Sequence, residues 1–150
     1  MNSKERVLQR ERERGRAAAL EVQDKASSMD GTQLNAADDR IPRFTEAVKR
    51  RNMLDRPLGF VCKSSAGRVV RLIQPYDSDI YRQEPEELSA HYGFVWSKDP
   101  KKALPFISLA TSPYMTGECC TYGGETYRSK IESNVWSPSS YPDGWEKVEV

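Results

Sequence analysis

The chain has 150 residues, of which 37% are hydrophobic and 30% charged, with a formal net charge of +1. This length suits one ordinary domain or two small ones, and the polar composition predicts that a sizeable segment lies outside the core. The near-neutral charge excludes the basic footprint of a nucleic-acid-binding protein, and no apolar run approaches the roughly 20 residues of a membrane span. The amino terminus carries no signal-peptide pattern, which predicts a soluble protein made in the cytoplasm or exported without a classical signal.

Residues 3–25 are predicted to form a helix, because good helix formers dominate and proline is absent. The apolar stripe of this helix is thin. A seven-residue repeat is formed by Met1, Leu8, Val22 and Met29. Gly15 falls in the middle of that repeat and weakens it. Two interpretations stay open: a solvated helix, or a helix that orders by packing against copies of itself or a larger assembly.

Residues 26–39 are rich in turn formers and are predicted to be a linker. A second helix is predicted to begin at Pro42, because the fixed backbone of proline suits a first helical turn. The apolar face of this helix comprises Phe44, Ala47 and Val48. Leu54 is expected to close that face.

From Leu58 onward the composition favours strands. The runs 58–62 and 68–73 are predicted to pair as a hairpin, 92–96 to form a further strand, and the acidic segment 83–87 to be a solvated loop. We expect an α+β, mainly β, protein. Its parts are a helical leader with linker (1–39), a central α+β domain (40–110) and a small C-terminal antiparallel β module (111–150).

The C-terminal module has an unusually high density of aromatic residues for its size: Tyr114, Tyr122, Tyr127, Trp136, Tyr141 and Trp145. A two-glycine turn at Gly123-Gly124 separates two predicted strands, and a proline-punctuated loop precedes a closing strand. So few residues form a stable sheet only if large rings supply much of the burial. Tyr127 and Trp145 are therefore predicted to lie in the core, and the module is predicted to bind rather than to catalyse.

The order and spacing of these residues resemble those of the chitin-binding modules of bacterial chitinases and cellulases, carbohydrate-binding family 5/12. The matching positions are Tyr114, Gly117-Glu118, Tyr122, Gly124, Tyr127, Asn134, Pro138 and Trp145. The resemblance covers about a quarter of the chain and implies a small β fold with an aromatic core. It also implies contact with a chitin-like or cell-wall polysaccharide.

One departure from that family concerns the sugar-binding rings. The positions where family members place a pair of exposed aromatics fall here at Ile131-Glu132, which cannot stack on a pyranose ring. Trp136 and Tyr141, in the loop stiffened by Pro138 and Pro142, are the alternative platform. The candidate ligand-binding residues are Trp136, Tyr141, Tyr122 and Asn134. The competing interpretation is that Trp136 packs over the sheet as part of the core.

The charged helical leader followed by such a module also resembles proteins from the tail regions of bacteriophages and prophages. This resemblance implies a non-enzymatic, tail-associated structural and adhesion protein of the virion. Its expected partners are host glycan, other tail proteins and further copies of itself, with a trimer the expected oligomer. The alternatives are an accessory carbohydrate-binding module of a glycan hydrolase, a purely structural tail or baseplate component, and a small hydrolase.

Catalytic and metal-binding patterns are weak. His91 is the one histidine and has no flanking signature, and no metal-ligand spacing or phosphate-binding loop is present. Carboxylates for glycoside hydrolysis would have to come from Glu84, Glu86, Glu87 and Glu118. Three cysteines do not make a disulfide framework; core burial is expected for two of them, and a bond from Cys62 to Cys119 or Cys120 stays open. No catalytic residue, metal or cofactor is predicted.

Overall fold

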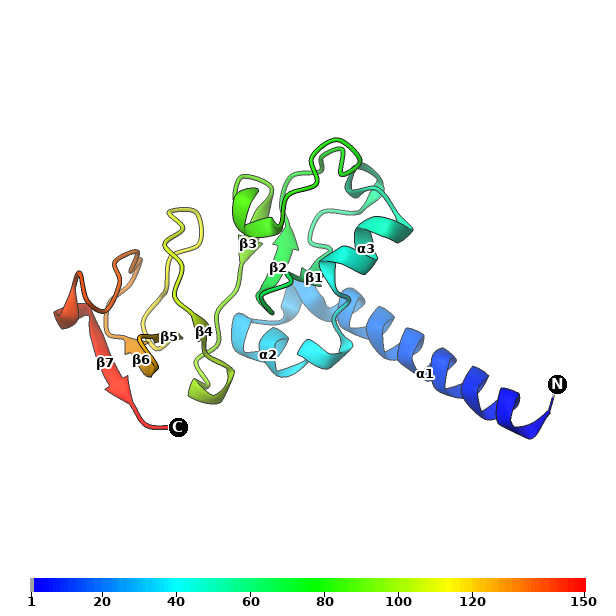
Figure 1. The fold of residues 1–150 in the computed structure, drawn as a ribbon, viewed down its shortest axis with the longest axis horizontal. Helices are drawn as coiled ribbons and strands as arrows, with labels where there is room; N and C mark the ends of the chain where they lie inside the picture. Colours follow the sequence, from blue (N-terminus) through cyan, green and yellow to red (C-terminus); the bar gives the residue numbers. More distant parts are fainter. Residues whose placement is uncertain (1) are drawn as a thin grey trace.

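The computed structural model describes residues 2–150, apart from the side chain of Ala18. Over these residues the chain forms three α-helices, several short 3₁₀ turns and two β-sheets, one of three strands and one of four (Figure 1). The expected α+β class is confirmed. Figure 1 shows the first sheet beside the helices and the second sheet, with the C-terminus, at the opposite end of the molecule from the N-terminus.

The first helix, α1 (Ser3–Lys25), has the bounds that the sequence predicts. Its start is fixed by a capping box: Asn2 Oδ1 accepts from the Glu5 N–H at 2.9 Å, and Glu5 Oε2 accepts from the Asn2 N–H at 3.2 Å. The amino-terminal half projects away from the rest of the protein (Figure 1) and is exposed. The last turns pack against the first sheet, so α1 is half solvated and half part of the fold.

The seven-residue repeat of α1 does not lie on one uniformly exposed face. Met1 lies outside the described residues, Leu8 is exposed, and Val22 is only 3% exposed. The Gln23 side chain fixes the buried end, donating to the Val61 carbonyl at 2.7 Å and accepting from the Val61 N–H at 2.9 Å. The amide thus takes the place of a neighbouring strand beside Val61.

The expected linker 26–39 is wrong, because this segment is helical and packs on the core. It contains α2 (Gly31–Ala36) and 3₁₀ turns at Ala26–Ser28 and Asp38–Arg40. A second capping box pairs Asp30 with Gln33, at 2.8 Å in both directions. Leu34 is fully buried. Gly31 lies so close to the Trp96 carbonyl that a Cβ atom would collide with it, so glycine begins this helix.

The next helix, α3 (Phe44–Arg50), begins two residues later than predicted, with Arg43 as its N-cap. Phe44 and Ala47 are buried as expected. Leu54, however, is 54% exposed, and its neighbour Met53 is fully buried in its place. A 3₁₀ turn (Met53–Asp55) after the helix changes the phase of the chain, which directs Met53 inward.

The first sheet consists of β1 (Val61–Lys63), β2 (Val69–Leu72) and β3 (Tyr92–Phe94), all antiparallel in sequence order. The predicted hairpin and third strand are confirmed. Alternation along the strands gives each face its own core. Val61 and Val69 pack with Val22 and Leu34 of the helices, whereas the opposite face packs on α3.

The second sheet has the order β4-β5-β6-β7. Its strands are β4 (Leu104–Pro105), β5 (Cys119–Tyr122), β6 (Glu125–Ser129) and β7 (Trp145–Val148). Gly123 and Gly124 have φ of 58° and 81°, which makes the two-residue turn between β5 and β6 that the sequence predicts. The short β4 pairs in parallel with β5. Because β4 precedes residue 111, this sheet includes residues from before the predicted module.

Aromatic rings join the two sheets. Tyr114 is fully buried between Trp96, 4.4 Å away between ring centroids, and Phe106, 5.6 Å away. Trp145 of β7 packs edge-on against the Tyr114 ring at 5.4 Å. One continuous cluster of buried residues therefore runs from α3 through the first sheet to β7.

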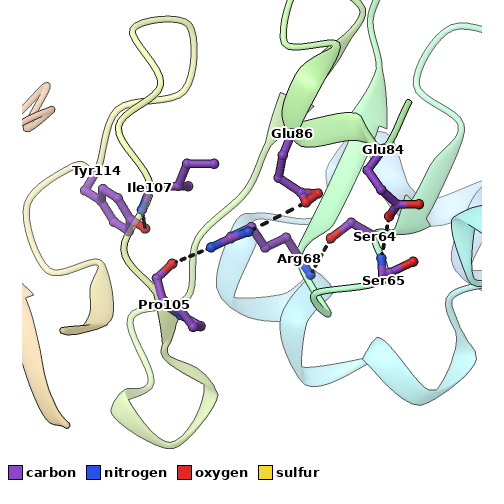
Figure 2. Close-up of polar contacts among 8 residues, drawn as sticks. All are labelled: Ser64, Ser65, Arg68, Glu84, Glu86, Pro105, Ile107 and Tyr114. Carbon is purple, nitrogen blue, oxygen red and sulfur yellow. Dashed lines mark hydrogen bonds and ion pairs between the residues drawn. The ribbon is translucent and has the colours of Figure 1, made fainter. Parts of the chain in front are cut away.

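A buried arginine adds a polar connection between the sheets (Figure 2). Arg68, at the start of β2, donates through Nη2 to the Pro105 carbonyl of β4 at 2.8 Å, and its Nη1 lies 3.6 Å from Glu86 Oε2. The expectation of a solvated acidic segment 83–87 is therefore wrong. The Glu86 side chain is only 15% exposed, and Glu84 accepts from the Ser65 N–H at 2.8 Å.

The three cysteines are free and buried. Burial raises the pKa of the Cys62 and Cys120 thiols to about 12, and the pKa of Cys119 also rises. All three act as small core residues, and Cys62 forms no bond to Cys119 or Cys120.

Candidate functional site

Three exposed rings lie on the second sheet and the loop before β7. Trp136 is 49% exposed, Tyr141 42% and Tyr122 38%, and we call these three residues the aromatic surface. The rings of Trp136 and Tyr141 are 5.7 Å apart between centroids and tilted by 35°. Large rings in water are uncommon in a module this small, where burial of each ring would stabilise the fold. Their exposure therefore marks this face as a candidate binding site.

Hydrogen bonds hold the loop that carries these rings. Tyr122, at the end of β5, shares a 2.7 Å hydrogen bond between its hydroxyl and that of Ser139. The N–H of Tyr141 donates to the Ser137 carbonyl at 3.0 Å, and Pro138 is buried beneath the loop. A loop fixed in this way loses little conformational entropy when a ligand binds.

Asn134 is predicted to contact ligand, but it is fully buried and cannot reach one. Its Nδ2 donates to Ser129 Oγ and to the Gly144 carbonyl, each at 3.1 Å, and its Oδ1 accepts from the Trp136 N–H at 3.3 Å. Its backbone pairs with that of Tyr114. The asparagine therefore positions the loop.

Trp145 is a buried ring that is hydrogen-bonded to the loop of the aromatic surface. It is 5% exposed, and its Nε1 donates to the Trp136 carbonyl at 2.8 Å. Tyr141 packs over Gly144, where a Cβ atom would lie 2.5 Å from the tyrosine ring. Trp145 is thus a core residue, as predicted, and Tyr127 is partly buried against the same core.

Ile131 and Glu132, where the resemblance would place the sugar-binding aromatics, lie in a bend between β6 and the loop. Ile131 is half-buried and Glu132 is exposed, so neither offers a flat face. A hollow of about 420 Å³ adjoins Tyr122. It is lined by Pro105, Phe106, Thr121, Tyr122 and the glycine turn. No sequence pattern predicts this hollow, because its walls come from β4, the end of β5 and the β5–β6 turn.

Most of the candidate catalytic side chains have structural partners, and Glu87 is exposed. His91 Nδ1 lies 3.0 Å from the Gln74 carbonyl, and its ring packs on Tyr76 at 4.8 Å. Glu118 accepts from the Met115 N–H at 2.7 Å, and partial burial raises its pKa although that hydrogen bond opposes the rise. Among the residues that the structure describes, no group of three or more His, Cys, Asp or Glu side chains is arranged to hold a metal ion.

Comparisons with family models, with curated proteins and with solved structures found no match for this chain. Within the described part of the chain, no helix combines the length and the apolar character needed to cross a bilayer.

Proposed function

We propose that this chain is a non-enzymatic attachment protein of a bacteriophage tail, and that its aromatic surface binds a polysaccharide of the host cell wall. The observation that carries the proposal is the exposure of Trp136 and Tyr141 as neighbouring rings on a fixed loop. Flat, rigid rings provide contact area at a small cost in conformational entropy. The resemblance of the module to chitin-binding domains supports glycan as the ligand.

The location in a virion and the trimeric state rest on the resemblance to tail-region proteins. Figure 1 supports a division of labour between the ends of the molecule, with α1 projecting at one end and the second sheet at the other. Detection of the chain in purified phage particles by mass spectrometry tests the location. Light scattering tests the oligomeric state.

Retention on chitin and on purified cell wall tests glycan binding. Trp136→Ala should reduce retention by at least tenfold, because it removes the larger ring of the pair. Its effect on the free energy of unfolding should stay within about 1 kcal/mol, since the side chain is half exposed. The matched control is Tyr81→Ala, which removes a 53% exposed ring outside the aromatic surface and should leave retention unchanged.

Equal retention of the wild type and Trp136→Ala on both materials would contradict the proposal. A purely structural tail or baseplate component would then be the better interpretation. Retention combined with stable association with a glycan hydrolase would favour an accessory carbohydrate-binding module instead.

A further inference from the structure

A groove of about 530 Å³ lies between the carboxy-terminal half of α1 and α3, away from the aromatic surface. Its floor is apolar and includes Leu20, Ala47 and Phe60. Leu20 is 63% exposed although it lies in the half of α1 that packs on the protein. An apolar floor that includes an exposed leucine is a surface that a partner can cover.

Four arginines surround this floor: Arg16, Arg43, Arg50 and Arg56. The one carboxylate in the lining, Glu46, lies 3.7 Å from the ammonium group of Lys49. In the described part of the chain, none of the four arginines forms an ion pair within 4.0 Å. We call this feature the arginine groove. Its lining carries four arginines against one carboxylate, so the groove is positively charged.

Arg56 shows the excess of positive charge in the groove most clearly. Its guanidinium lies 4.3 Å above the Phe60 ring, and Nη2 donates to the Ala47 carbonyl at 2.9 Å. Its Nε is buried without a hydrogen-bond partner. Burial, followed by the nearby charges of Arg51 and Arg50, lowers its pKa. An anionic group in the groove would offset the repulsion between these arginines, and its attraction would compensate for the water that the Arg56 guanidinium has lost.

The groove is elongated. A second hollow continues it along α1 and shares Arg16, Ala19 and Arg50 with it, adding Arg12 and Gly15. Gly15 has no side chain to obstruct the path, and no atom lies within 4 Å of where its Cβ would be. From Arg12 to Gln23 the helix rises by roughly 16 Å, or about three turns. This length suits a short helical segment better than a compact ligand.

We propose that the arginine groove binds an acidic, amphipathic segment of a partner protein, with apolar side chains on its floor and carboxylates against its arginines. A nucleic-acid backbone would match the arginines but leave the apolar floor without a complementary surface. A helix laid into an apolar groove uses both features. In the proposed attachment protein, this partner would bind at the anchoring end. The arginine groove is separate from the glycan-binding aromatic surface.

The test uses the full chain and a fluorescein-labelled synthetic helix of leucine and glutamate, with leucine at i, i+3, i+4 and i+7. Fluorescence anisotropy should show saturable binding that weakens as salt rises. Arg16→Glu and Arg50→Glu should each weaken binding at least tenfold. The matched control is Arg14→Glu, an exposed position on α1 outside the groove, which should change the affinity less than threefold.

One further variant of the protein and one of the peptide separate the apolar from the charged contribution to binding. Leu20→Ser removes apolar floor without changing charge and should also weaken binding. A peptide with lysine in place of glutamate should not bind. Circular dichroism confirms that each variant is folded before its affinity is compared.

Several outcomes would overturn the inference. These are the absence of saturable binding, equal weakening by groove and control variants, and tighter arginine-dependent binding of a single-stranded oligonucleotide or of anionic lipid vesicles. A dimer in light scattering that Arg50→Glu abolishes would also overturn it, because a second copy would then occupy the groove. Trp136→Ala should leave peptide affinity unchanged and Arg16→Glu should leave chitin retention unchanged, so failure at one surface is distinguishable from failure at the other.

Discussion

The two sheets of this protein cover their faces by different means. The end of α1 and α2 pack on one face of the first sheet, and α3 packs on the other. The second sheet has mainly 3₁₀ turns beside it, η5 (Pro100–Lys102) and η6 (Pro142–Gly144). Its interior is closed by the rings of Tyr114, Phe106 and Trp145.

The difference shows how a small sheet without helical cover keeps a surface free for binding. In the first sheet, both apolar faces are buried against helices. In the second, a few buried rings are enough for stability, so Trp136 and Tyr141 remain outside the core. The free surface next to the first sheet instead lies on the helices themselves, in the arginine groove.

The largest expected effect comes from removing a ring that closes the second sheet. Trp145→Ala should lower the free energy of unfolding by about 3–5 kcal/mol, because it empties a buried site and leaves the Trp136 carbonyl without its donor. Urea unfolding followed by far-UV circular dichroism and by tryptophan fluorescence measures this. Coincident transitions are expected, since the two sheets share one buried cluster.

Two separate transitions would instead show that residues 111–150 fold as an independent domain. The domain boundary that the sequence predicts at residue 110 would then also separate two cooperative folding units. The contribution of β4 to the second sheet favours a single transition.

A smaller effect is expected at the polar connection between the sheets. Glu86→Gln leaves the buried Arg68 guanidinium without an anion, although the Pro105 carbonyl still accepts from it. We expect a loss of about 2–3 kcal/mol in the free energy of unfolding. Glu87→Gln, at the exposed neighbouring position, is the matched control and should change it by less than about 0.5 kcal/mol. Equal effects would mean that the buried pair contributes no more than a surface charge.

The smallest effect is a pH dependence in the second sheet. Partial burial raises the pKa of Glu118 in the folded protein, so the folded state holds this proton more tightly than the unfolded state. Stability from this group is therefore present at low pH and falls as pH rises from near 4.5 through the raised pKa. Glu118→Gln should remove this decline and still accept from the Met115 N–H. A profile from pH 4 to 7 that is unchanged by the substitution would contradict the assignment.

Local patterns in the sequence predicted the elements that depend on local interactions. Residues 3–25 have the composition of a helix, and Gly123-Gly124 has the chemistry of a tight hairpin turn. The prediction of a linker at residues 26–39 was wrong, although the sequence contains a signal for the helix found there. Asp30 and Gln33 have the spacing of a capping box. The linker prediction rested on turn-forming composition alone.

Other features depend on contacts between distant residues and had no local signal. The two-residue strand β4 forms only because β5 lies beside it. The burial of Asn134 depends on Tyr114 and Gly144, which satisfy its backbone and amide groups. The arginine groove needs α1 and α3 together, which no local pattern in either helix indicates.

The buried thiols give each sheet its own native reporter. Cys62 lies in β1 and Cys120 in β5, and with pKa values of about 12 neither offers a reactive thiolate to solvent near neutral pH. An alkylating reagent can therefore reach either sulfur only while the surrounding strands are transiently open. The relative rates at which the two cysteines are modified would reveal whether the halves of the molecule open together or one at a time, without any engineered label.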